Sequence, residues 1–136
     1  MDKKTKDALT KELKNKTLLI TGGAGSIGSV LVKKILEFPV KTVRVLDIDE
    51  HALFRLNHIV NDKRLRLLLG SITDKERVEM AGYNVDIILH LAAIKNIEIS
   101  EFNPIETIDT NVSGMINLLK MSMRNKPKKF LNISTD

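Results

Sequence analysis

The segment Thr21-Gly22-Gly23-Ala24-Gly25-Ser26-Ile27-Gly28 joins a short apolar run to a helical pattern, and this junction decides the fold. Its last six residues match G-x-G-x-x-G, and the whole segment matches T-G-x-x-G-x-x-G. Glycines at such a turn let the backbone approach a pyrophosphate, and the following helix offers free N–H groups and a favourable dipole. The segment therefore predicts a dinucleotide-binding turn, with a chance glycine turn as the alternative.

Apolar runs alternate with helical patterns along the rest of the chain. The expected strands cover residues 17–21, 42–47, 64–69, 85–91 and 130–133. The expected helices cover residues 2–16, 26–38, 50–60, 74–80 and 104–124, the second ending before Pro39. Strand–helix–strand units of this length predict right-handed crossovers. We therefore expect an α/β fold, a doubly wound parallel (Rossmann) sheet of about five strands with helices on both faces.

Composition narrows the class of protein. The 136 residues are enough for one domain, and aromatic residues make up only 4%, so the core must be aliphatic, as in a buried parallel sheet. The chain has no cysteine, which excludes disulfides, thiolate nucleophiles and cysteine-ligated metals and is compatible with a reducing cytoplasm. No apolar run reaches the roughly 18 residues of a membrane helix.

The net charge of +5 is unevenly placed. Residues 1–16, a predicted lysine-rich helix ahead of the 17–136 domain, hold six lysines and three acids. A second basic cluster consists of Lys120, Arg124, Lys126, Lys128 and Lys129. Nucleic-acid binding calls for basic residues interleaved with aromatics, which are absent from both clusters. We interpret the clusters as solvated helix faces, with a polyanion site as the alternative, and expect no nucleic-acid partner.

Asp47 ends the second expected strand about 20 residues after the glycine motif, the spacing at which an acid binds ribose hydroxyls. A carboxylate there accepts a hydrogen bond from the 2′-hydroxyl but repels a 2′-phosphate. The next residues, Ile48-Asp49-Glu50, add acid and no base, which favours NAD over NADP. Asp47 could instead be a turn or N-cap residue, although Asp49 is the better N-cap candidate.

Several motifs together resemble the extended short-chain dehydrogenase/reductase superfamily: the glycine turn, Asp47, His90-Leu91-Ala92-Ala93 and Thr110-Asn111-Val112-Ser113-Gly114. Two stretches, AAIKN at 92–96 and EFNPIE at 101–106, resemble the AAxKH…EyNPxE pattern of bacterial polysaccharide-biosynthesis UDP-N-acetylglucosamine 4,6-dehydratases. The closing Ile133-Ser134-Thr135-Asp136 is similar to the STD that begins their active-site segment and is shared by dTDP-glucose 4,6-dehydratases. The resemblance covers about residues 17–136.

The resemblance implies roles for individual residues. Cofactor contacts would come from Gly22, Gly25, Ser26, Ile27, Gly28, Asp47, Ser71, Ile72, Leu91, Ala92, Ala93 and Lys95. Thr135 would hydrogen-bond the reacting hydroxyl of a UDP-sugar, and Asp136 would protonate the departing C6 hydroxyl. Asn111 would organise the active site or its water. The complete enzyme would oxidise C4, lose water across C5 and C6, and return the hydride to C6; it would form a homo-oligomer.

Plainer interpretations stand beside these roles. Asn111 could bond backbone within a helix, Thr135 and Asp136 could cap a strand, and Lys95 could be a surface lysine. His90, inside an apolar strand, is interpreted as a packing residue. His51 and His58 share a helix face without a third ligand, so no metal site is expected.

The sequence also departs from the family pattern. Gly70-Ser71 stands where the superfamily usually has Gly-Asp, and Asn96 stands where the dehydratases have His. The catalytic Tyr-x-x-x-Lys is missing, since the single tyrosine, Tyr83, is followed at position 87 by Ile. We expect an N-terminal portion of a longer 4,6-dehydratase, truncated before its catalytic pair and substrate domain. A natural truncation acting as a non-catalytic NAD-binding module, or a fragment of a 4-epimerase, are the alternatives; Asp136 disfavours the epimerase.

Overall fold

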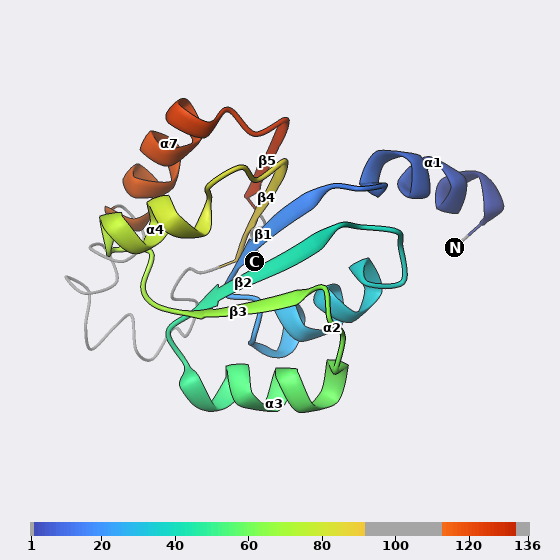
Figure 1. Cartoon of the computed structure of the whole chain (residues 1–136), viewed down its shortest axis with the longest axis horizontal. Coiled ribbons are helices and arrows are strands. Elements are labelled where there is room, and N and C mark those ends of the chain that lie inside the picture. The colour runs from blue at the N-terminus through green and yellow to red at the C-terminus, as the bar shows by residue number, and fades with distance from the viewer. Residues whose placement is uncertain (1, 92–112, 133–136) are drawn as a thin grey trace.

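A five-stranded, all-parallel sheet in the order β3-β2-β1-β4-β5 forms the centre of the protein (Figure 1). The computed structural model describes residues 2–91 and 113–132. Its elements run α1 Lys3–Leu13, β1 Thr17–Thr21, α2 Ser26–Ile35, β2 Thr42–Asp47, α3 Glu50–Val60, β3 Leu65–Leu69, α4 Lys75–Ala81, β4 Ile87–His90, α7 Gly114–Asn125 and β5 Lys129–Asn132. The predicted doubly wound parallel sheet is confirmed.

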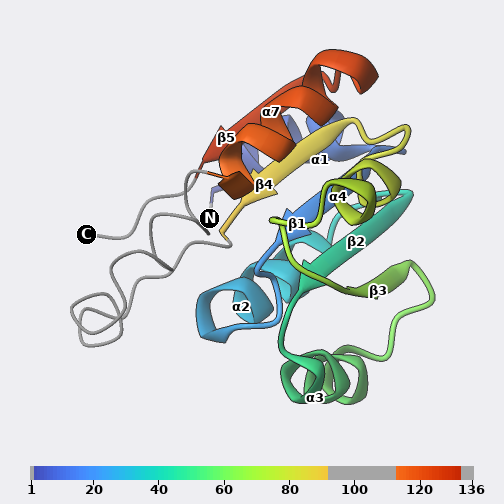
Figure 2. The same cartoon turned by 90° about the vertical axis from the view of Figure 1, so that its left-hand side faces the viewer.

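The central strands β1 and β4 are buried on both faces, and alternate residues supply two separate cores. Leu18 and Ile20 of β1 face a cluster that includes Val32 of α2 and Leu56 of α3. Leu19, between them, faces the other cluster, which is shared with α4 and α7. Figure 2 shows the same division, with α2 and α3 on one side of the sheet and α4 and α7 on the other. The aliphatic residues at the middle of β1 and at the start of β4 suit this double coverage.

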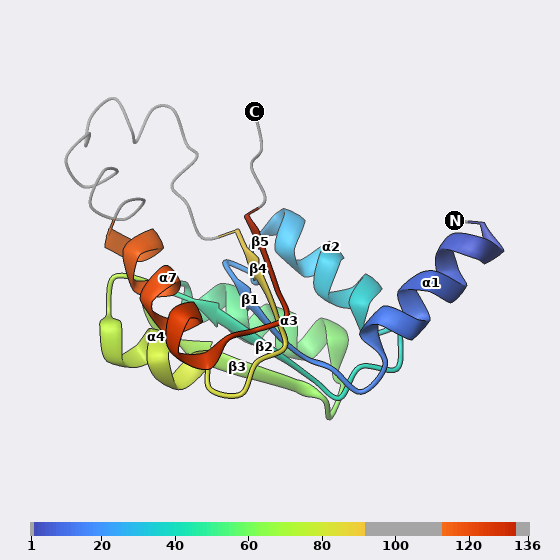
Figure 3. The same ribbon diagram turned by 90° about the horizontal axis from the view of Figure 1, so that it is seen from above.

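Helix α1 is attached to the domain rather than standing apart from it. Asp2 caps the helix by accepting a hydrogen bond from the Thr5 N–H at 2.7 Å. Leu13 is buried and Leu9 packs against the α2–α3 side of the core. An ion pair between Glu12 and Lys129 joins the helix to β5. Figure 3 shows α1 beside α2, away from α4 and α7.

Several element boundaries differ from expectation. The prediction that α2 extends to residue 38 is wrong by three residues, because the chain tightens after Ile35: the Glu37 and Phe38 N–H groups donate to the Lys34 and Ile35 carbonyls, one residue short of helical spacing. Strand β4 is shorter than 85–91, and α1 is shorter than 2–16. The part of the predicted 104–124 helix before residue 113 lies outside the described residues. No helix in the described part of the chain combines the length and apolar character needed to cross a bilayer.

Candidate dinucleotide-binding site

The glycine turn leaves β1 at the carboxyl edge of the sheet and enters α2. Gly22 has a φ of 75°, in the left-handed region, and its N–H donates to the Leu46 carbonyl of β2 at 2.8 Å. A Cβ on Gly28 would lie 2.5 Å from the Gly23 Cα, so the first turn of α2 packs directly on the loop backbone. The fold itself therefore requires glycine at both positions.

Gly25 is different, because the chain does not require glycine there. Its φ is −71°, and an added Cβ would meet only the Gly22 carbonyl oxygen, at an ordinary 3.7 Å. Gly25 is the N-cap of α2, and no side chain caps that helix end. The first N–H groups of a helix lack intrahelical partners, so the open space at Gly25 faces unpaired donors and the positive end of a dipole. A pyrophosphate fits this cradle in both shape and charge.

Asp47 connects the end of β2 to the glycine turn. Its Oδ2 accepts a hydrogen bond from the Ala24 N–H at 3.2 Å, and its Oδ1 accepts one from the Asp49 N–H at 3.0 Å. Asp47 thus shapes its own turn and also lies against the loop that the motif predicts to hold phosphates. Asp49 caps α3 by accepting from the Ala52 N–H at 3.0 Å, which confirms that expectation.

A buried pair of polar side chains joins the carboxyl ends of β1 and β4. Thr21 Oγ1 lies 2.6 Å from His90 Nδ1, and both residues are buried. The same Thr21 oxygen accepts from the Leu91 N–H at 3.2 Å, and the Thr21 carbonyl accepts from that N–H at 2.8 Å. His90 is therefore a packed and hydrogen-bonded residue, in agreement with its interpretation from the sequence. The pair fixes the glycine turn relative to Leu91.

The segment after β3 is tied to α7. Ser71 Oγ bonds Thr73 Oγ1 at 2.7 Å and accepts from the Thr73 N–H at 3.1 Å, so the predicted cofactor contact Ser71 also forms a local turn. The side chain of Ile72, also predicted to contact the cofactor, is buried in the α4–α7 core, where it fills the space that a Cβ on Gly114 would need. Asn117 Nδ2 donates to the Ile72 carbonyl at 2.9 Å. Any contact of Ile72 with a cofactor would therefore be through its backbone.

A hollow of about 390 Å³ lies between the first turn of α2 and helix α3. It is lined by Ala24, Gly25, Ser26, Ser29, Asp49, Ala52, Arg55, Leu56 and Ile59. Arg55 was not among the residues predicted from the sequence. Helical spacing could have indicated Arg55 from the sequence, because residues 49, 52, 55, 56 and 59 share one face of the helix that Asp49 caps. The residues directly after Asp47 add acid and no base, but the folded surface beside the glycine turn also carries the basic side chain of Arg55.

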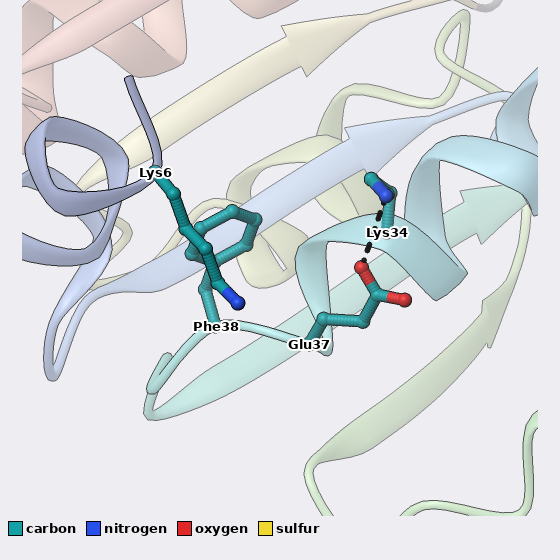
Figure 4. Close-up of a pocket in the computed structure, with 4 residues that line it drawn as sticks. All are labelled: Lys6, Lys34, Glu37 and Phe38. Carbon is teal, nitrogen blue, oxygen red and sulfur yellow. Dashed lines mark ion pairs between the residues drawn. The ribbon is translucent and has the colours of Figure 1, made fainter. Parts of the chain in front are cut away.

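A second hollow lies near the other end of α2 and is separate from the glycine turn. Figure 4 shows Lys6 of α1 and Phe38 lining it, together with Lys34 and Glu37. Lys34 and Glu37 form an exposed ion pair at 3.3 Å. This hollow lies beyond the C-terminus of α2, so it contributes nothing to the phosphate cradle.

Six of the predicted site residues lie outside the described part of the chain: Ala92, Ala93, Lys95, Asn111, Thr135 and Asp136. Their assignments stay predictions. Within the described residues, the structure brings Gly22, Gly25, Gly28 and Asp47 together around the start of α2.

The sheet order, the glycine turn after β1 and the acid after β2 define a Rossmann domain. The relatives described below assign this domain to the extended short-chain dehydrogenase/reductase type. The profile of the polysaccharide biosynthesis protein family matches residues 18–136, and the chain belongs to this family.

Three curated relatives illustrate the family. An uncharacterized membrane protein of Methanocaldococcus jannaschii is 47% identical over 90% of this chain and 37% of its own length. An inverting UDP-N-acetylglucosamine 4,6-dehydratase of Campylobacter jejuni is 37% identical over 89% of this chain and 36% of its own. A UDP-glucose 4-epimerase of Rickettsia prowazekii is 33% identical over 90% of this chain and 37% of its own. The chain thus spans little more than a third of these relatives.

Solved structures give the same picture. Pen from Bacillus thuringiensis superposes with a TM-score of 0.84 at 37% identity, over 88% of this chain and 37% of that one. The dTDP-glucose 4,6-dehydratase DesIV of Streptomyces venezuelae, solved with NAD and TYD, has a TM-score of 0.76 at 32% identity, over 84% and 38%. UDP-glucose 4-epimerase of Thermotoga maritima, solved with UDP-glucose, has a TM-score of 0.75 at 31% identity, over 88% and 38%.

Proposed function

We propose that this chain is the NAD-binding portion of a nucleotide-sugar 4,6-dehydratase, with the 17–136 segment as its Rossmann domain. The observation that carries the cofactor assignment is the space at Gly25, which the chain leaves open at the uncapped N-terminus of α2. A side chain there would cost the fold little, whereas it would occupy the place of a pyrophosphate. Relatives named as nucleotide-sugar dehydratases and epimerases support the substrate class.

Each described residue has a definite task in this proposal. The N–H groups at the start of α2, including those of Ser26 and Ile27, would bind the pyrophosphate oxygens. Asp47 would accept hydrogen bonds from the adenosine ribose while its other contact holds the glycine turn through Ala24. The Thr21–His90 pair would position Leu91 beside the cofactor. These residues bind and orient the cofactor, and none of them carries out the chemistry.

The reacting groups of the proposal lie outside the described residues. Bound NAD would take a hydride from C4 of the sugar and later return it to C6. Asp136 would give a proton to the C6 oxygen as it leaves, Thr135 would hydrogen-bond the reacting hydroxyl, and Asn111 would order the site. The AAIKN and STD motifs at 92–96 and 134–136 support dehydration over other chemistry on the same fold.

A 4-epimerase is the second candidate, supported by the relatives that carry this name. The two activities differ in mass balance, because dehydration removes one water and epimerisation removes none. Incubation of the complete protein with UDP-N-acetylglucosamine or UDP-glucose, followed by chromatography that resolves the epimers and by mass spectrometry, separates them. A product lighter by one water supports the dehydratase, and an isomer of unchanged mass overturns it in favour of the epimerase.

The cofactor assignment has its own test in two glycine substitutions. Gly25→Ala is expected to fold normally and to weaken NAD binding at least tenfold by calorimetry, which corresponds to about 1.4 kcal/mol. Gly28→Ala should instead lower the thermal unfolding temperature strongly, since its Cβ would overlap backbone. Unchanged NAD affinity in folded Gly25→Ala would exclude the cradle as the binding site.

A further inference from the structure

Charged residues stand directly before all five strands, and four of the five are basic. They are Arg64 before β3, Lys41 before β2, Lys16 before β1, Asp86 before β4 and Lys128 before β5. Because the strands are all parallel, these residues gather along one edge of the sheet, in that order. We call them the amino edge. The glycine turn and Asp47 lie at the opposite, carboxyl edge.

Hydrogen bonds fix neighbouring members of the amino edge to one another. The Lys41 N–H donates to the Lys16 carbonyl at 2.9 Å, and the Lys128 N–H donates to the Asp86 carbonyl at 2.8 Å. Asp86 Oδ2 also accepts from the Thr17 N–H at 2.8 Å, so this acid has a structural task within the edge. The positions of the three lysines therefore follow from the sheet itself.

Two of these lysines lie side by side although they carry the same charge. Contact with the Lys128 side chain lowers the pKa of Lys16, and Coulomb repulsion between the two ammonium groups acts in the same direction. Asp86 and Glu12 act against this shift with smaller effects. Like charges held together disfavour each other's charged form, and a bound anion would relieve this repulsion.

The amino edge also unites the two basic clusters that are far apart in the sequence. The ion pair between Glu12 and Lys129 joins α1 to β5. Lys14 follows α1 and Lys126 follows α7, and both are exposed. Helix α1 packs on the domain through Leu9 and Leu13, which leaves its other lysines facing outward. Figure 1 shows α1 beyond the start of β1, so its lysines extend the basic surface of the edge.

The kind of basic residue indicates the kind of partner. Lysine offers a hydrated point charge on a flexible stem, whereas recognition of single phosphates favours the planar fork of arginine. The guanidinium of Arg64 is already bonded to Asp62 and to two backbone carbonyls. Neither basic cluster contains an aromatic residue on which bases could stack. Flexible lysines without such contacts suit a diffuse anionic surface, and clusters of this kind bind acidic phospholipids.

One exposed aromatic residue supports the same partner. Tyr83 lies in the loop before β4, at the same end of the sheet, and is 63% exposed. Its loop is fixed to the end of α7, because Asn125 Nδ2 donates to the Gly82 carbonyl at 3.2 Å. A tyrosine has an apolar ring with a polar tip, which suits the headgroup layer of a membrane.

We propose that the amino edge and the exposed lysines of α1 dock the protein on an anionic phospholipid surface. The five residues of β1 separate this edge from the glycine turn, a length of roughly 17 Å. Docking through the amino edge therefore leaves the carboxyl edge turned away from the membrane and open to a ligand. The proposal is independent of the cofactor assignment.

The test measures co-sedimentation of the complete protein with vesicles. One set contains phosphatidylcholine alone, and the other contains equal parts of phosphatidylcholine and phosphatidylglycerol. Binding is expected only to the anionic set and should weaken as salt is added. Lys41→Gln with Lys128→Gln should weaken binding about twentyfold, since each lysine near an anionic surface contributes about fivefold. Lys33→Gln with Lys75→Gln, which removes the same charge from exposed positions on α2 and α4, is the matched control.

Folding of the variants can be checked by circular dichroism. Both substituted edge lysines are exposed, and loss of Lys128 also removes the repulsion on Lys16, so no loss of thermal stability is expected. If the double variant does not fold, each single variant should still lose about fivefold in vesicle binding. A single-stranded oligonucleotide and inorganic phosphate, added at equal ionic strength to sodium chloride, serve as competitors.

Four outcomes would overturn the proposal. The first is no binding to anionic vesicles at low salt, and the second is equal binding to neutral vesicles. The third is an equal loss in the edge and control variants, which would mean that only the net charge matters. The fourth is stronger competition by the oligonucleotide or by phosphate than by chloride, which would assign the edge to nucleic acid or to a discrete anion. Loss of NAD binding alone would overturn the cofactor assignment and leave the docking surface in place.

Discussion

The backbone N–H of Ala24 donates to the carboxylate of Asp47, so the glycine turn and the end of β2 are held together by the same acid that the ribose would contact. The second carboxylate oxygen accepts from the Asp49 N–H. The acid is therefore ordered before any ligand arrives, and a ligand would need little further ordering of this side chain.

Substitution of Asp47 should affect both binding and stability. Asp47→Ala removes two hydrogen-bond acceptors and is expected to lower the free energy of unfolding by about 1–2 kcal/mol. NAD affinity should fall more than NADP affinity, because the ribose loses an acceptor while the 2′-phosphate loses a repelling charge. Calorimetry on Asp47→Ala and on the near-isosteric Asp47→Asn would check this. Equal losses for NAD and NADP in both variants would contradict the ribose role.

The Thr21–His90 pair should contribute to stability. Thr21→Val keeps the side chain's shape but leaves His90 Nδ1 without its hydroxyl partner in a buried position. The expected loss is about 1–3 kcal/mol in the free energy of unfolding, measured by urea denaturation. Thr10→Val on exposed α1, which also removes a hydroxyl hydrogen bond, should cost less than about 0.5 kcal/mol. Equal losses of unfolding free energy at the two sites would show that the buried pair stabilises the fold no more than the hydrogen bond on α1 does.

Asp62 should make part of the stability depend on pH. The Arg64 side chain lies 2.9 Å from its carboxylate, and this hydrogen bond lowers the pKa of Asp62. A lowered pKa in the folded state means a stabilisation fully present above the unfolded-state pKa of about 4 and lost as the pH falls through the folded-state pKa. Asp62→Asn should therefore flatten the decline in stability below about pH 4. Denaturation curves between neutral and acidic pH decide this, and a decline unchanged by Asp62→Asn would contradict it.

An exposed apolar stripe on α7 predicts self-association. Ile116, Leu119 and Met123 are 45%, 49% and 77% exposed and share one helix face, opposite the buried Leu118. The resemblance to the short-chain dehydrogenase/reductase superfamily implies a homo-oligomer, so the expected partner is a second copy of the protein. Leu119→Glu with Met123→Glu should shift sedimentation toward the monomer. Phe54→Glu, at a 65% exposed apolar residue on α3, is the control and should leave the assembly unchanged.

Local patterns were sufficient for most of the fold. Strands β1 and β2 and helix α3 begin and end where the sequence predicts, because continuous apolar runs and the Asp49 cap leave few alternatives. The end of α2 was mispredicted because Pro39 prevents helix only near its own position, and the chain had already tightened after Ile35. In the same way, the sequence predicted that Ser71 and Ile72 belong to a cofactor-binding segment. It did not predict that the Ile72 side chain is buried against Gly114.

The sequence alone determined the sheet, the glycine turn and the acid at Asp47, because these depend on spacing along one strand–turn–helix unit and on the strand that follows. Only the tertiary structure decided that Gly22 and Gly28 are required by the fold and that Gly25 leaves room for a ligand. The distinction depends on atoms that the fold brings together from separate segments. The same holds for Arg55. It lies eight positions after Asp47 in the sequence, and the packing of α3 beside α2 places it next to the glycine turn.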